Sequence, residues 1–185
     1  MRSFLFFCCL LTFTSCGRCG WGGYYRHGIQ QYTGDGVISD ASQSSGGLGS
    51  RGYVVEFPKF DLGADYERQF KLAGLPTLGS APAEIRLVVE DATLENQKNS
   101  LAAKIVIKLL ESSGRQVAGY TAKLSDLIWS SPIHDHAGSA LYELNHSEFV
   151  PRTDEIYTLS VSYIADTALQ SKNGYIYVWC GCGGS

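Results

Sequence analysis

The sequence predicts an all-β fold, an antiparallel β-sandwich of seven to nine strands. Short runs in which apolar and polar residues alternate recur along the chain, separated by turn-forming residues. No long stretch shows the 3.6-residue period of an amphipathic helix. The chain has 185 residues, 44% of them apolar, which is enough for one domain with its own core.

The clearest unit is a hairpin within Ala102–Leu124. Two apolar runs flank the polar segment Glu111–Arg115, in which Gly114 can take the positive φ that a tight turn needs. A two-stranded ribbon is only marginally stable in water, so the hairpin requires further strands and an opposing sheet.

Six other segments have the pattern of strands: 53–57, 66–72, 84–91, 141–144, 157–164 and 175–180. The last is apolar on both faces, which predicts a central strand or an interface. Arg68 falls on the apolar side of its segment, and this predicts an edge position where its head group reaches water. Ser125-Asp126 predicts a short helical turn that carries Leu127, Ile128 and Trp129.

The chain begins like a secreted protein. Arg2 precedes the uncharged apolar run Phe4–Phe13, and residues 1–15 are therefore interpreted as a signal peptide. This run is too short to span a bilayer as a helix, which takes about 20 residues.

Thr14-Ser15-Cys16 resembles the lipobox of bacterial lipoproteins, with Phe13 where that family usually has Leu. The resemblance implies that Cys16 is the lipidated (palmitate-bearing) first residue of the mature chain. It also implies a lipid anchor in the outer membrane, facing the periplasm or the cell surface, because Gly17 replaces the Asp that favours inner-membrane retention. Ordinary secretion is the alternative.

The remaining chain divides into three parts. Residues 16–52 include 11 glycines in the 36 positions from Gly17 to Gly52, which predicts a lipid-anchored Gly/Ser-rich tether with a span of roughly 30–36 Å. Residues 53–180 form the sandwich domain and 181–185 a tail. The tether also carries aromatic residues that could pack on the domain, lie in the lipid interface or stay disordered: Trp21, Tyr24, Tyr25 and Tyr32.

The charge distribution argues against nucleic acid as a partner. Without residues 1–15 the chain has 14 basic and 18 acidic residues, a net charge of −4. The sequence has no cluster of Lys and Arg of the kind that phosphate backbones require.

Four cysteines remain after the leader: Cys16, Cys19, Cys180 and Cys182. In an oxidising compartment, Cys19 is expected to form a disulfide with Cys180 or Cys182. Two alternatives stay open: the four thiolates could hold a structural zinc ion, or the glycine-flanked tail could be frayed. No cofactor is expected.

Asp154-Glu155-Ile156-Tyr157 resembles the start of the strand that carries the tyrosine corner in immunoglobulin-like sandwiches. The resemblance implies that the Tyr157 hydroxyl bonds back to the main chain. Leu159 stands where those domains have cysteine, so no intersheet disulfide is expected, and a jelly-roll topology is the alternative.

The sequence contains no nucleophile elbow, phosphate-binding glycine loop or calcium loop. His134 and His136 could hold a divalent metal together with Asp135 or His146, and Ser139 could complete a triad with His134 and Asp135, but a polar loop is the simpler interpretation.

We therefore expect no enzyme, but a noncatalytic binding module tethered to the cell envelope, with an unknown envelope protein or polysaccharide as partner. The irregular segment 129–146 is the expected binding site, because insertions on a rigid sandwich often carry function. The residues expected to take part are Trp129, His134, His136 and Tyr142. A metal-dependent hydrolase using His134 and His136, or an architectural component that associates through its last strand, are the alternatives.

Overall fold

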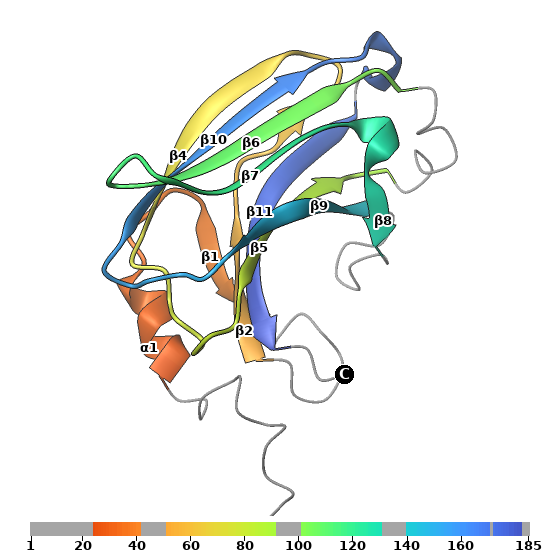
Figure 1. Cartoon of the computed structure of the whole chain (residues 1–185). Helices are drawn as coiled ribbons and strands as arrows, with labels where there is room; N and C mark the ends of the chain where they lie inside the picture. The colour runs from red at the N-terminus through yellow and green to blue at the C-terminus, as the bar shows by residue number, and fades with distance from the viewer. Residues whose placement is uncertain (1–23, 42–50, 92–100, 131–139, 171, 183–185) are drawn as a thin grey trace, which may run out of the picture.

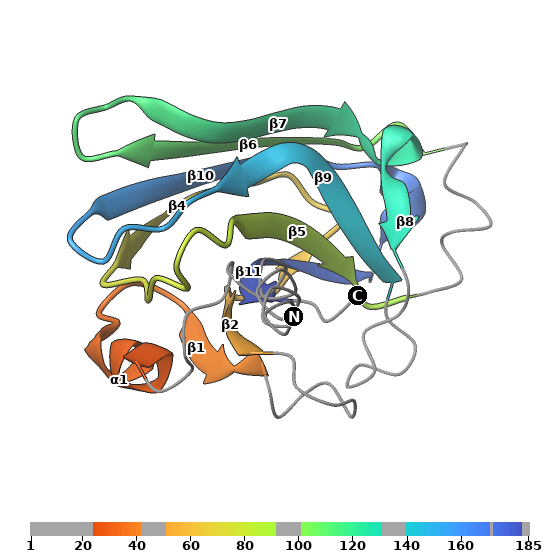
Figure 2. The same cartoon turned by 60° about the horizontal axis from the view of Figure 1, so that its bottom comes forward.

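The computed structural model describes residues 24–41, 51–91, 101–130, 140–170 and 172–182. Within them, two antiparallel sheets pack face to face (Figures 1 and 2). The larger sheet consists of β1 (Val37–Asp40), β2 (Arg51–Glu56), β3 (Phe60–Asp61), β5 (Ala83–Val89), β8 (Ile128–Ser130), β9 (Ala140–Phe149) and β11 (Asn173–Cys182). The smaller sheet consists of β4 (Tyr66–Ala73), β6 (Lys104–Glu111), β7 (Gln116–Lys123) and β10 (Ile156–Ile164). The predicted β-sandwich is confirmed.

The strand order is that of a jelly roll. In the described part of the chain, eight strands have six residues or more, and they form the orders β2-β11-β5-β9 and β4-β10-β6-β7. Strands distant in sequence pair across the fold, β2 with β11 and β4 with β10. This is the double-sheet arrangement of jelly rolls rather than the strand order of immunoglobulin domains. The short strands β1, β3 and β8 extend the larger sheet.

The core lies between the two sheets. The alternation along β10 directs four side chains inward, each at most 1% exposed: Tyr157, Leu159, Val161 and Tyr163. The hairpin β6–β7 contributes Ile105, Ile107 and Leu109 to the same core, and Gly114 in its loop has the expected positive φ of 81°. These inward residues occupy every second position of the predicted strands, as the two-residue period of a half-buried strand requires.

β11 lies between β2 and β5, as the double-sided apolar pattern predicts. Its side chains Ile176, Val178 and Cys180 belong to the main core. Because both edges of β11 are already paired, the strand has no edge left for joining a second molecule. An association through the last strand would therefore have to use its outer face rather than an edge, and that expectation stays a prediction.

Part of the predicted tether is folded. The helix α1 (Tyr24–Gln31) and the strand β1 both lie within 16–52, and β1 pairs with β2. Ile29, Tyr32 and Ile38 pack against the main core. These apolar residues outweigh the high glycine content, so Tyr32 packs on the domain, one of the three alternatives left open.

The segment before β9 also differs from expectation. The helical turn is a 3-10 turn at Leu124–Asp126, and Ile128 and Trp129 lie in β8 instead. β9 is longer than 141–144, and its register with β5 shifts between Glu84 and Arg86. The buried Ser147 hydroxyl donates to the carbonyl of Ile85 at this irregularity, at 2.8 Å. Pairing with β9 has decided the conformation of β8, which local propensity could not reveal.

Candidate functional site

The structure brings two of the predicted site residues together. Trp129 in β8 and Tyr142 in β9 are directly opposed in register, at one edge of the larger sheet. His134 and His136 lie outside the described residues, so the metal-binding and triad hypotheses that use them remain predictions. Within the described ranges, no group of three or more His, Cys, Asp or Glu side chains is arranged to hold a metal ion.

Cys180 does not behave as a disulfide partner. Its thiol is free, fully buried, and 3.9 Å from the carbonyl oxygen of Ala81. Burial raises the pKa of this thiol to about 11, which keeps it protonated and unreactive. The alternation of β11 turns this side chain into the core, so Cys182 is the better placed of the two expected partners of Cys19. Cys182 ends β11 two residues later and stays a candidate; Cys16 and Cys19 lie outside the described residues.

The outer face of the larger sheet carries a second apolar cluster, separate from the core. Tyr175 and Tyr177 of β11 form it with Val88 of β5, and Trp179 and Val54 pack against it. We call these five residues the outer-face cluster. The sequence showed that β11 is apolar on both sides, but it could not show that β2 and β5 would complete a patch beside it.

Arg86 contacts this cluster and forms an ion pair with Glu84. Its guanidinium lies 4.9 Å from the centre of the Trp179 ring, and its Nε donates to the Glu84 carboxylate at 2.8 Å. Burial by itself would lower the pKa of Arg86, but Tyr177 and Glu84 hold the pKa above its usual value. Arg86 is therefore a fixed cation held against an aromatic ring.

The register connects Arg86 with the predicted binding segment. Arg86 lies opposite Tyr177 of β11 on one side and opposite Glu143 of β9 on the other. Val88 likewise lies between Tyr175 of β11 and Leu141 of β9. The outer-face cluster thus borders β9 at Leu141 and Glu143. Tyr142 is in register with Leu87 of the main core, and Trp129 is in register with Tyr142, so these two positions alternate with the outer-face ones.

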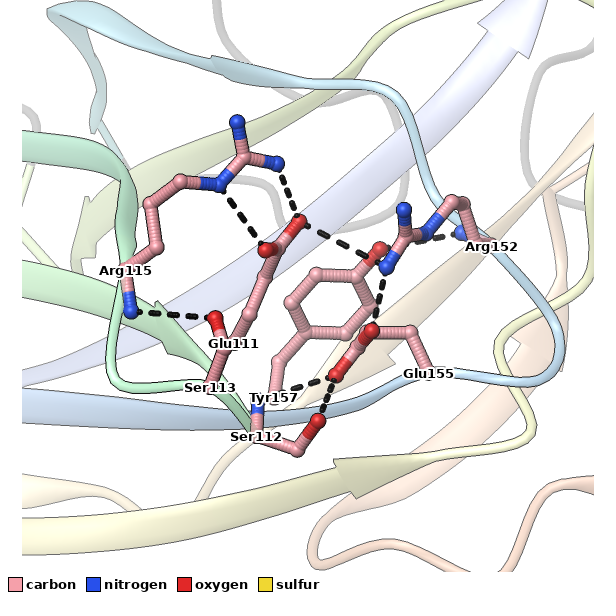
Figure 3. Close-up of polar contacts among 7 residues, drawn as sticks. All are labelled: Glu111, Ser112, Ser113, Arg115, Arg152, Glu155 and Tyr157. Carbon is pink, nitrogen blue, oxygen red and sulfur yellow. Dashed lines mark hydrogen bonds and ion pairs between the residues drawn. The ribbon is translucent and has the colours of Figure 1, made fainter.

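A second polar group lies where the β6–β7 hairpin loop meets the start of β10 (Figure 3). The Glu111 carboxylate accepts from Arg115 at 3.0 Å and 2.8 Å, and Arg152 lies 3.7 Å from it. Glu155 pairs with Arg152 and accepts from the main-chain N–H of Ser112 at 2.9 Å.

Tyr157 completes this network. Its hydroxyl accepts from the main-chain N–H of Arg152 at 3.0 Å, which is the bond that the tyrosine-corner resemblance implied. The hydrogen bonds from Ser112 and the ion pair with Arg152 lower the pKa of Glu155 to about 2. Both carboxylates are saturated by partners from the same network, so we assign it the role of fastening two loops rather than of binding a ligand.

No protein-family model matches this sequence, and a search of curated proteins finds no significant similarity. No helix in the described part of the chain has the length and apolar character needed to cross a membrane. Interpretation of the site therefore depends on the chemistry of its own residues.

Proposed function

We propose that this chain is a noncatalytic binding module that holds a partner molecule against the outer-face cluster and the adjoining edge formed by β9 and β8. The observation that carries this proposal is the pair of partly exposed side chains Trp179 and Arg86 on the outer face of the larger sheet, supported by the buried Tyr177 beside them. Trp179 and Arg86 are both half-buried, with the Arg86 side chain 16% exposed.

These residue types favour a protein partner. Trp, Tyr and Arg dominate the binding energy of protein interfaces, because they offer a large contact area together with polar groups. Arg86 is already held by Glu84 and Trp179, so binding costs little additional side-chain entropy. A polysaccharide is the second candidate, since the indole ring of Trp179 provides a flat apolar surface.

A matched pair of arginine variants tests this proposal. Arg86 lies over Trp179 on the larger sheet, and Arg68 lies 5.7 Å from the ring of Phe70 on the smaller one. With a photo-crosslinking residue at Val54, we expect a discrete crosslinked product in source cells. Arg86→Ala should reduce its yield about tenfold, as for an interface hot spot, while Arg68→Ala leaves it unchanged.

Cosedimentation with purified cell-wall polysaccharide distinguishes the second candidate. Sedimentation that is lost in Arg86→Ala and retained in Arg68→Ala would assign a polysaccharide partner. A binding role for this face would be refuted if no crosslinked product forms at Val54 and if cosedimentation with the polysaccharide is unchanged in both arginine variants.

We further propose that the module is tethered to the cell envelope through a lipid on Cys16. The support is the apolar leader and the lipobox-like Thr14-Ser15-Cys16. Several acyl chains make a lasting membrane anchor, whereas a single chain is marginal. Mass spectrometry of the N-terminal peptide should show acylated Cys16. The Cys16→Ala variant should be lost from the membrane fraction. An unmodified Cys16 in the membrane-bound protein would contradict the anchor.

A further inference from the structure

A segment after α1 lies along the open edge of β4 without being a strand itself. The main-chain N–H of Thr33 donates to the carbonyl of Ala73 at 3.0 Å, and that of Asp35 donates to the carbonyl of Lys71 at 2.6 Å. The two bonds run antiparallel, as in a β-ladder. We call residues 33–35 the strap.

A side chain completes the ladder-like pairing. The N–H of Lys71 donates to the Asp35 carboxylate at 2.6 Å, where a regular ladder would use the Asp35 main-chain carbonyl. That carbonyl accepts from the Tyr32 hydroxyl instead. The strap thus satisfies both outward main-chain groups of Lys71.

The close approach depends on Gly34. A Cβ atom at this position would lie 2.6 Å from the main-chain oxygen of Lys71 and 2.5 Å from the Tyr32 hydroxyl. Both contacts are far below van der Waals distance, and the first is with main chain that cannot rotate away. Gly34→Ala is therefore a small substitution that should lift the strap from β4.

Among the residues that the structure describes, the strap covers half of this edge. Main-chain groups alternate in direction along a strand, so Glu67 and Gln69 point outward as Lys71 does. The strap bonds only to Lys71 and Ala73, and β10 occupies the opposite side of β4. Glu67, Arg68 and Gln69 have exposed side chains, so the uncovered half is accessible from solvent.

The complete edge of β4 is complementary to itself. If two copies pair antiparallel about a two-fold axis at Gln69, Glu67 of each copy lies opposite Lys71 of the other, which gives two opposite-charge pairs. This pairing requires the outward groups of Lys71, which the strap occupies. The register centred one residue earlier places Arg68 opposite its own copy, and like charges there are unfavourable.

We propose that the strap blocks pairing at the edge of β4 by occupying the main-chain groups of Lys71. Displacing the strap then lets two copies of this chain join through their smaller sheets. The occupant of the uncovered edge is a second copy of β4, paired by main-chain hydrogen bonds and by Glu67 with Lys71. The proposal is independent of the outer-face cluster, which lies on the other sheet.

Sedimentation velocity on the full chain tests this inference. The parent protein should be monomeric, and Gly34→Ala should form dimers whose fraction rises with concentration. Adding Lys71→Glu should weaken dimerisation about tenfold, because two attractive pairs become repulsive. Adding Glu67→Lys to that variant should restore it. Lys123→Glu reverses an exposed charge on β7, the other edge strand of the smaller sheet, and should change nothing.

A second strap variant protects the test against misfolding. Asp35→Ala removes the carboxylate that bonds to Lys71 and leaves Gly34 intact, so it should also produce dimers. Circular dichroism identifies which strap variants are folded. Folded strap variants that stay monomeric would overturn the proposal. Dimers that are insensitive to Lys71→Glu would also overturn it, as would a complex in which the edge of β4 pairs with a strand of another protein instead of a second copy.

Discussion

Tyr163→Ala should lower the free energy of unfolding by about 3–5 kcal/mol, the range for removing a buried aromatic side chain. Tyr163 is 1% exposed, and its ring centre lies 5.4 Å from that of Phe60. Its hydroxyl donates to the carbonyl of Leu62 at 3.0 Å, which fastens the chain after β3 to β10 of the smaller sheet. Urea unfolding followed by circular dichroism measures the loss.

Tyr163→Phe separates the ring from the hydroxyl. This variant keeps the packing and deprives the buried Leu62 carbonyl of its hydrogen-bond donor, so we expect a smaller loss of about 1–3 kcal/mol. Equal losses in the two variants would mean that the hydroxyl carries the effect. A loss in Tyr163→Ala of less than that in Tyr163→Phe would contradict the described packing.

Acid should destabilise the fold through three carboxylates with lowered pKa values. Hydrogen bonds from Ser112 bring the pKa of Glu155 down to about 2 from 4.5, and Arg115 lowers the pKa of Glu111. The main-chain N–H groups of Ala168 and Ala102 lower the pKa of Asp166. Since each group binds its proton more weakly when folded, its contribution is complete above the unfolded pKa and disappears as the pH falls through the folded value.

The urea midpoint should therefore stay constant from neutral pH to about pH 4.5 and fall steadily towards pH 2. Glu155→Gln provides the control, because it removes one titrating group and leaves Glu111 and Asp166. This variant should be less stable than the parent at neutral pH and should lose less stability on acidification. Parallel pH profiles for the two proteins would exclude Glu155 as a source of the acid sensitivity.

Residue patterns predicted much of the fold because alternation acts locally. The strand predicted at 157–164 is β10, whose alternate residues Tyr157 and Tyr163 lie in the core, and the conflicting Arg68 correctly indicated an edge strand. Local patterns failed where long-range pairing decided the structure. β8 formed from a segment expected to be helical, and α1 and β1 formed within a glycine-rich tether.

The candidate site was harder to predict for the same reason. Trp129 and Tyr142 were singled out in an irregular segment, and the structure places them at an edge of the larger sheet. In the larger sheet, β5 separates the aromatic residues of β11 from β9. Arg86 lies between β11 and β9 only because β5 pairs with both strands, and long stretches of chain separate the three in the sequence.

By itself, the sequence determined that strands form, which of their residues share a face, and that Gly114 closes a hairpin. It could do so because the two-residue period of a strand is a property of neighbouring residues. Only the tertiary structure decided the jelly-roll strand order, the outer-face cluster and the position of the strap beside β4. These features depend on contacts such as that between Asp35 and Lys71. The two residues are 36 positions apart, and no local sequence pattern links one to the other.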